Sequence, residues 1–287
     1  MDYVNPNALV STEWLATHMS APDIRIVDTS YFLPGVPRDA KAEYRECHIP
    51  GAVFFDIDDI ADETITDLPH MIPSPEKFSS RVRRLGLGDG NRIVVYDSMG
   101  GGMAACRVWW MFRLYGHDDV SVLNGGLPKW LAEGRPTDDM PPVPRERHFT
   151  ARFNNFLVRK VDQLIDNVAT GKELVVDARS AGRFKGEAEE PRPGMRKGHM
   201  PGSVNLPFTD LMDKDQNFVF RSADEIKEIF DKSGADTNRT LVASCGSGVT
   251  ACVIALAGYL IGKEDIAVYD GSWSEWGSRQ DTPITRD

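Results

Sequence analysis

The chain has 287 residues, of which 41% are hydrophobic and 26% charged, proportions typical of a globular protein rather than a disordered or fibrous one. This length predicts two domains, because a typical domain holds about 150 residues. The net charge of −10 disfavours nucleic acid and anionic membranes as partners, although a local cluster of arginines could still bind an anionic substrate.

The first residues, 1–6, lack the basic segment followed by an apolar run that marks a secretory signal, and no stretch of about 18 apolar residues occurs later. Four cysteines are too few for a disulfide framework in a chain of this length: Cys47, Cys106, Cys245 and Cys252. We therefore expect a protein of the cytoplasm or, in a eukaryote, of the mitochondrial matrix, without membrane contact.

Both halves alternate short apolar runs with helical patterns. Ser74 before Pro75 predicts a helix start, and the segment from Ser222 to Glu225 is a capping box. Apolar runs predict strands at 93–96, 120–123, 241–244 and 266–269. Residues 249–261 are apolar almost all round, which predicts a buried helix that ends at Gly262. The fold class is therefore α/β, with parallel sheets covered by helices on both faces.

The two halves are also similar to each other in sequence. Four landmarks recur in the same order, about 150 residues apart: Ile26–Asp28 and Val175–Asp177, His48–Val53 and His199–Val204, Ile93–Asp97 and Thr240–Cys245, and Leu123–Trp130 and Tyr269–Trp276. This pattern predicts a duplicated domain. A proline-rich, charged stretch separates the copies, so we place the domains at 1–140 and 158–287, with a linker at 141–157.

Cys245 lies where a predicted strand ends and a buried helix begins, the edge at which parallel sheets place their ligands. The turn Gly246–Gly248 can direct backbone N–H groups toward a common centre, and the helix N-terminus adds partial positive charge. Both effects favour a thiolate, the nucleophilic form of cysteine, and would also stabilise a persulfide anion.

Other interpretations of the cysteines are weaker. Cysteine phosphatases need an arginine six residues after the nucleophile, and here that residue is Ala251. Cys106 and Cys252 fall in apolar helices and are expected to pack. Cys47 has His48 beside it but no second ligand at metal-binding spacing, so we expect neither a metal nor a cofactor.

The loop, the duplication and the two His-x-Pro-Gly turns together resemble the rhodanese superfamily of sulfurtransferases, over nearly the whole chain. Residues 245–250 read Cys-Gly-Ser-Gly-Val-Thr, as in the mercaptopyruvate sulfurtransferase subfamily, whereas thiosulfate-using relatives carry basic residues just after the cysteine. The position equivalent to Cys245 in the first half is Asp97, which cannot accept sulfur. We therefore expect a non-catalytic first domain and a catalytic second one.

The resemblance also implies roles for particular residues. Arg183 and Arg192 occupy the places of substrate-binding arginines, and the loop residues Gly246, Gly248, Val249 and Thr250 would supply N–H groups. Ser247 and His48 would form a proton relay, with Asp39 orienting the imidazole. His199, the repeat counterpart of His48, is expected to be structural.

These roles imply a monomeric enzyme that moves sulfur from 3-mercaptopyruvate to a thiol such as that of thioredoxin, or to cyanide, through a Cys245 persulfide and with release of pyruvate. Two alternatives stay open. One is a thiosulfate:cyanide sulfurtransferase, and the other is a rhodanese-like binding module whose thiol is incidental.

Overall fold

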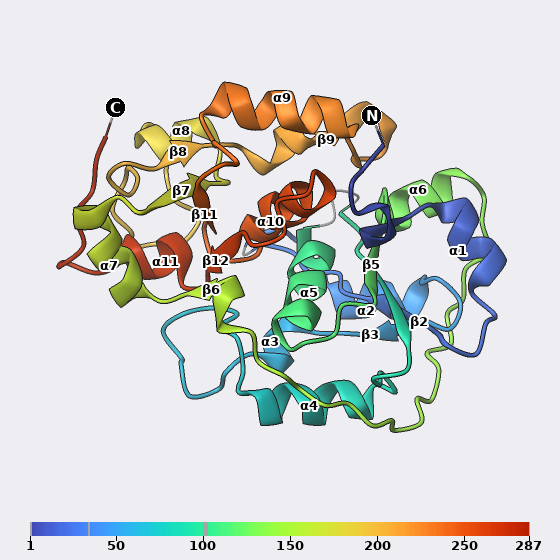
Figure 1. Ribbon diagram of the computed structural model, residues 1–287. Helices are drawn as coiled ribbons and strands as arrows, with labels where there is room; N and C mark the ends of the chain where they lie inside the picture. Colours follow the sequence, from blue (N-terminus) through green and yellow to red (C-terminus); the bar gives the residue numbers. More distant parts are fainter. Residues whose placement is uncertain (1, 34, 100–102, 287) are drawn as a thin grey trace.

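In the computed structural model of the chain, residues 2–33, 35–99 and 103–286 are described (Figure 1). Two five-stranded sheets form, and every strand pair within them is parallel. The first sheet has the order β1 (Leu9–Val10), β5 (Val120–Leu123), β4 (Arg92–Tyr96), β2 (Ile24–Asp28) and β3 (Val53–Phe54). The second has the order β6 (Val158–Arg159), β12 (Ala267–Tyr269), β11 (Thr240–Ser244), β7 (Glu173–Asp177) and β8 (Val204–Asn205). The two sheets share one strand order, which confirms the predicted α/β fold and its duplication.

Helices accompany each sheet. In the first half they are α1 (Thr12–His18), α2 (Ala40–Glu46), α3 (Ile57–Ile60), α4 (Pro75–Arg84), α5 (Met103–Leu114) and α6 (Gly126–Ala132), with a 3₁₀ turn at Pro6–Ala8. In the second half they are α7 (Val161–Thr170), α8 (Ala181–Lys185), α9 (Ala223–Ser233), α10 (Ala251–Leu260) and α11 (Ser272–Trp276), with 3₁₀ turns at Asn155–Leu157, Phe208–Leu211 and Lys214–Gln216. A small antiparallel pair, β9 (Met212–Asp213) and β10 (Val219–Phe220), lies outside the main sheet. Among the described residues, no helix is long and apolar enough to cross a membrane.

The predicted helix starts are confirmed. The Ser74 side chain accepts a hydrogen bond from the Lys77 N–H, and Ser222 forms a reciprocal capping box with Glu225. The helix expected at 249–261 is shorter in the structure, Ala251–Leu260. Val249 and Thr250 stay in the turn that precedes the helix, and the chain leaves the helix at Ile261.

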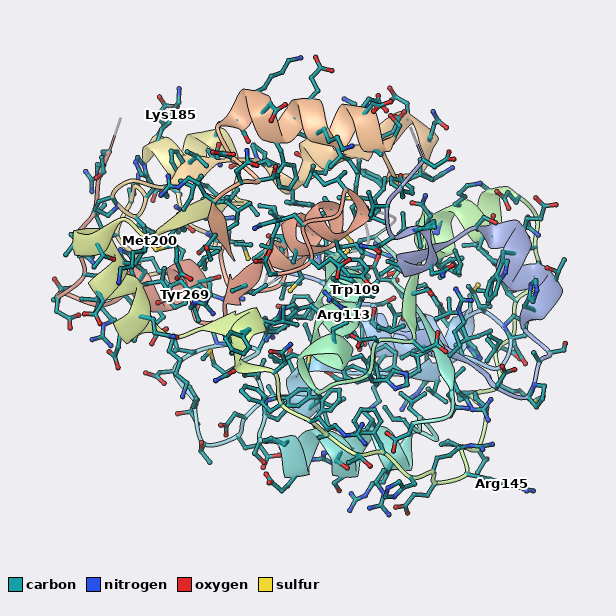
Figure 2. All side chains as sticks on the ribbon, viewed as in Figure 1. Trp109, Arg113, Arg145, Lys185, Met200 and Tyr269 are labelled. Carbon is teal, nitrogen blue, oxygen red and sulfur yellow. The ribbon has the colours of Figure 1, made fainter. Side chains whose placement is uncertain are left out.

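The two domains meet through α5 and α10, which lie side by side at the centre of the molecule (Figure 1). Both helices are largely apolar, with Arg107 and Arg113 as the charged residues of α5, and nearly every residue of each is buried, so each packs against its own sheet and the other helix at once. Trp109 packs edge-on against Tyr259, and the Arg113 guanidinium lies 4.2 Å from the Tyr259 ring centroid; Figure 2 shows Trp109 and Arg113 in this central layer. One hydrophobic core therefore runs through both domains.

Backbone hydrogen bonds hold the segment between the domains, residues 141–157, against the first domain. Asn154 and Arg152 donate to the carbonyls of Leu114 and Tyr115, and Arg147 donates to that of Arg83. At the other end of the chain, the Val4 N–H donates to the carbonyl of Leu260 in the second domain. We propose the division 1–140, 141–157 and 158–287, in which residues before Pro6 belong to the first segment and pack on the second domain.

Candidate active site

Cys245 follows β11, the central strand of the second sheet, and precedes α10. Its side chain is buried, at 2% exposure. The backbone around it is held from α11: the Cys245 N–H donates to Ser272 Oγ at 3.1 Å, and the Cys245 carbonyl accepts from the Trp273 N–H at 2.9 Å. The cysteine position is thus fixed by backbone contacts that do not involve its sulfur.

Two glycines permit the close approach of other groups to this loop. Gly248 has φ +76°, and a Cβ there would lie 2.6 Å from the carbonyl oxygen of Asp270. A Cβ at Gly246 would lie 3.0 Å from Nη2 of Arg183. At the start of α10, Thr250 makes no side-chain capping bond, and the N–H groups of Cys252 and Val253 donate to the carbonyls of Val249 and Thr250. Such an N-terminus favours an anion such as a thiolate or persulfide.

Both predicted substrate arginines have definite neighbours. Arg183, in α8, donates from Nε and Nη2 to Glu190 Oε2 at 3.1 and 2.5 Å, and its guanidinium lies beside Gly246. Arg192 Nη2 lies 3.5 Å from Nε2 of His70. The structure therefore places Arg183 at the Cys245 loop and Arg192 at a loop contributed by the first domain.

A histidine that the sequence did not single out reaches this region. His70 Nδ1 lies 2.5 Å from Asp58 Oδ1, and this hydrogen bond lowers the pKa of the Asp58 carboxyl. The His70 ring is almost fully buried and meets the edge of Tyr31. Its backbone has φ +59°, a left-handed conformation that is strained for a histidine and typical of functional sites. Asp58 thus holds Nδ1, and Nε2 lies on the side of Arg192, where it faces any ligand that this arginine binds.

The structure does not bring His48 and Asp39 together in the expected relay. His48 Nδ1 lies 2.6 Å from the Tyr44 carbonyl oxygen, its ring stacks on Tyr44, and its Nε2 has no hydrogen-bond partner among the described residues. Asp39 caps α2 and accepts from the N–H groups of Lys41 and Ala42. Neither residue joins Ser247, which is itself buried in the catalytic loop.

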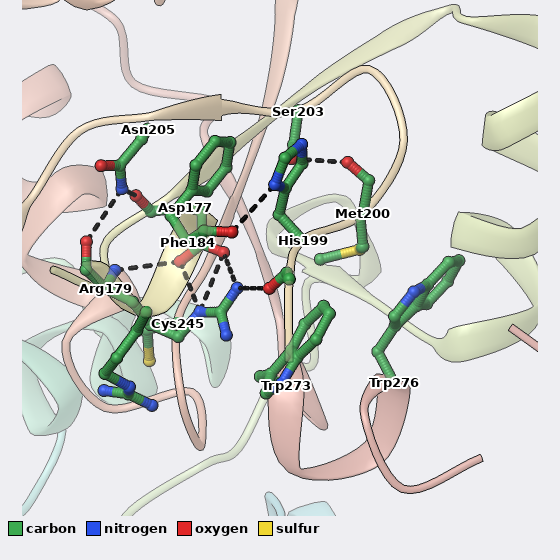
Figure 3. A network of polar contacts seen from close by, with 12 residues as sticks. Asp177, Arg179, Phe184, His199, Met200, Ser203, Asn205, Cys245, Trp273 and Trp276 are labelled. Carbon is green, nitrogen blue, oxygen red and sulfur yellow. Dashed lines mark hydrogen bonds and ion pairs between the residues drawn. The ribbon is translucent and has the colours of Figure 1, made fainter. Parts of the chain in front are cut away.

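His48 instead has the role that its repeat counterpart has in the second domain. His199 Nδ1 lies 2.9 Å from the Phe184 carbonyl oxygen, and its ring stacks on that phenylalanine; Figure 3 shows both rings. Each histidine also forms a backbone bridge to a later segment, His48 to Asp138 and His199 to Thr285. The interpretation of His199 as structural therefore extends to His48.

An ion pair between Arg107 and Asp270 joins the first domain to the second beside the Cys245 loop. Arg107, in α5, donates from Nη2 to Asp270 Oδ1 at 2.6 Å and to the His70 carbonyl at 2.7 Å, and from Nη1 to the Gly248 carbonyl at 3.3 Å. Asp270 Oδ2 accepts from the Ile72 N–H. Burial acts to lower the pKa of Arg107, but the interactions with Asp270 and Cys252 together outweigh burial and the pKa is raised. The Arg107 guanidinium thus contacts both the loop that follows Cys245 and the loop that holds His70.

In the first domain, Asp97 lies at the end of β4, where Cys245 follows β11 in the second. Its two carboxylate oxygens accept from the N–H groups of Met99 and Ala105, and burial raises its pKa to about 6. The first domain thus keeps N–H donors at this position but has a carboxylate where the second has a thiol. No cluster of His, Cys, Asp or Glu that could hold a metal occurs in the parts of the chain that the structure describes.

Two parallel-sheet domains of one strand order, with a buried cysteine after the central strand of the second, define the class of protein. The chain belongs to the rhodanese-like domain family, whose model matches it twice, over residues 11–133 and 160–279. The predicted tandem rhodanese-like architecture and sulfurtransferase class are confirmed.

Two sulfurtransferase activities appear in the names of similar proteins. The chain is 43% identical to a 3-mercaptopyruvate sulfurtransferase of Homo sapiens, over 95% of this chain and 92% of that protein. It is 44% identical to a thiosulfate sulfurtransferase of Mus musculus, over 97% and 94%. Among solved structures, SseA of Escherichia coli, described as a 3-mercaptopyruvate sulfotransferase, matches at 37% identity with a TM-score of 0.84, over 93% of this chain and 98% of that one.

Proposed function

We propose that this enzyme transfers sulfur from 3-mercaptopyruvate to a thiol acceptor through a persulfide on Cys245, and releases pyruvate. The observation that carries this proposal is the position of Arg183 beside Gly246, one residue from Cys245. A planar guanidinium at that place suits the carboxylate of a 2-oxo acid whose thiol group points at the cysteine. The loop itself brings no cation at positions 246–250.

In the first half-reaction, Arg183 and Arg192 hold the carboxylate and the carbonyl of the substrate. The Cys245 thiolate attacks the substrate sulfur and forms the S–S bond, while the S–C bond breaks and its electron pair becomes the enolate of pyruvate. The N–H groups of the loop from Gly246 to Thr250 stabilise the persulfide. A proton then converts the enolate to pyruvate.

In this scheme the proton donor is His70 rather than His48, because Asp58 holds Nδ1 and Nε2 lies next to Arg192, which holds the substrate from which the enolate forms. Ser247, two residues after Cys245, would pass that proton within the loop. In the second half-reaction an acceptor thiolate attacks the outer sulfur, and Cys245 leaves as a thiolate. Thioredoxin, or cyanide in an assay, would serve as acceptor, with the enzyme acting as a monomer in the cytoplasm or the mitochondrial matrix.

The experiment that tests the identity of the sulfur donor compares kcat/KM for mercaptopyruvate and for thiosulfate, each with the same thiol acceptor. Mass spectrometry after exposure to each donor should show the Cys245 peptide heavier by one sulfur, about 32 Da. We expect the larger kcat/KM with mercaptopyruvate. A preference for thiosulfate would assign the chain to the other named activity, and no added sulfur from either donor would favour a binding module.

His70→Asn is expected to lower kcat with mercaptopyruvate by about 10²-fold and to change KM little, because it removes the proposed proton donor and leaves both arginines. Steady-state kinetics at several pH values would check this. The matched control is His48→Asn, which loses a buried packing contact and should lower Tm with a smaller effect on kcat. Equal losses of kcat in the two variants would contradict the assignment to His70.

A further inference from the structure

The buried carboxylate of Glu190 pairs with Arg183, the proposed substrate arginine. The Glu190 side chain is only 2% exposed, and its two oxygens bind different arginines: Oε2 accepts from Arg183 at 2.5 Å and Oε1 accepts from Arg179 at 2.7 Å. The neighbouring Glu189 is 85% exposed and pairs with Lys197 instead. Of these adjacent acids, Glu190 alone contacts the guanidinium beside the Cys245 loop.

Arg179 does not need Glu190 for its own charge. It is held by Asp177, whose Oδ2 accepts from Nη2 at 2.6 Å, it donates to the Gly198 carbonyl at 2.8 Å, and its guanidinium lies over the Trp273 ring. Figure 3 shows Arg179 bound to Asp177, with Trp273 and Cys245 nearby. Glu190 also binds Arg179, and the two carboxylates of Asp177 and Glu190 balance the two guanidinium groups of Arg179 and Arg183, so without Glu190 the cluster would have one uncompensated positive charge.

This contact has two consequences for a ligand. Glu190 occupies Nε and Nη2 of Arg183, and within the described residues no protein acceptor binds Nη1, which therefore stays open to substrate. Glu190 also offsets the positive charge that a substrate meets beside Gly246. In a buried site such an offset is weakly screened by solvent.

We propose that Glu190 is a specificity-determining residue, which limits the positive charge at Arg183 so that the site favours a monoanionic thiol donor over a dianionic one. The inference rests on the proposed function and deepens it. At neutral pH 3-mercaptopyruvate has one negative charge, its carboxylate, whereas thiosulfate has two. Because Arg183 is already paired with Glu190, the site suits the single negative charge of 3-mercaptopyruvate. The second negative charge of thiosulfate would lie close to the Glu190 carboxylate and be repelled by it.

The test is Glu190→Gln, which removes the charge and keeps an amide of similar shape behind Arg183. We expect the ratio of kcat/KM for mercaptopyruvate to that for thiosulfate to fall by about tenfold, chiefly through a lower KM for thiosulfate. The shift should shrink as salt is added. Glu189→Gln makes the same charge change one residue away and should move the ratio less than about twofold. Glu190→Asp keeps the charge and should keep the preference for mercaptopyruvate.

An equal fall in kcat/KM for both donors in Glu190→Gln would make Glu190 a structural residue and overturn the proposal, as would an equal shift in Glu189→Gln. A measurement that needs no variant is inhibition of the unaltered enzyme by pyruvate, a monoanion, and by sulfate, a dianion. Stronger inhibition by sulfate would also overturn it. If the unaltered enzyme takes no sulfur from mercaptopyruvate, the proposed function itself fails; if it does and the ratio is unmoved, only this inference fails.

Discussion

Cys245→Ser is expected to abolish sulfur transfer from mercaptopyruvate and from thiosulfate, by at least about 10³-fold, because a serine hydroxyl cannot carry a persulfide. The fold should survive. The loop is held through the backbone of residue 245, which contacts Ser272 and Trp273, and the exchange of sulfur for oxygen leaves those bonds in place. Steady-state turnover and thermal unfolding together measure both halves of this expectation.

The matched control is Cys252→Ser, seven residues further on in α10. Cys252 is fully buried, burial raises its pKa, and its thiol donates to the Gly248 carbonyl, a bond that a serine hydroxyl can replace. This variant should still gain about 32 Da on the Cys245 peptide. Substantial turnover in Cys245→Ser, or added sulfur on the Cys252 peptide instead, would contradict the persulfide on Cys245.

The sequence was sufficient to predict the parts of this molecule that local pattern controls. The capping serines, the strands and the turn at Cys245 follow from residue types within a few positions of one another, and the structure confirms them. The duplication was visible because each landmark keeps its place relative to the next. The start of α10 was misplaced by two residues, since Val249 is apolar like the helix but belongs to the loop.

His70 could not be found in the same way. It lies in an irregular segment between α3 and α4, and only the packing of the two domains brings it to Arg192. His48 is the more conspicuous histidine in the sequence because it stands in the His-x-Pro-Gly turn. Its repeat counterpart His199 makes a similar contact from Nδ1 to a backbone carbonyl, and this similarity favours a structural role for both.

Arg107 did leave a signal in the sequence. It is the only charged residue between Met103 and Phe112, and the one other charged residue of this helix, Arg113, lies in its last turn. A charge in such a helix must be buried or displace the helix from the core, and a buried charge needs a partner. What the sequence could not supply was the identity of that partner, Asp270, which lies in the other domain.

Arg107→Met is expected to lower the free energy of unfolding by about 3 to 5 kcal/mol, because it leaves the Asp270 carboxylate buried without its cation. Side-chain exposures of 1% for Arg107 and 4% for Asp270 mean that solvent cannot replace the lost partner. Activity should fall as well, since Arg107 also fixes the carbonyls of Gly248 and His70. Denaturant unfolding and kcat/KM of the folded variant would measure the two effects.

A double variant, Arg107→Met with Asp270→Leu, separates the ion pair from simple packing. Removal of both charges relieves the uncompensated carboxylate, so the double variant should lose less stability than the sum of the two single variants, with a coupling energy of about 1 to 3 kcal/mol. Its activity should stay low, because neither new side chain can donate to Gly248 or His70. Additive losses of stability would show that the pair does not join the domains. Full activity in the double variant would show that the loop and His70 are held in place without it.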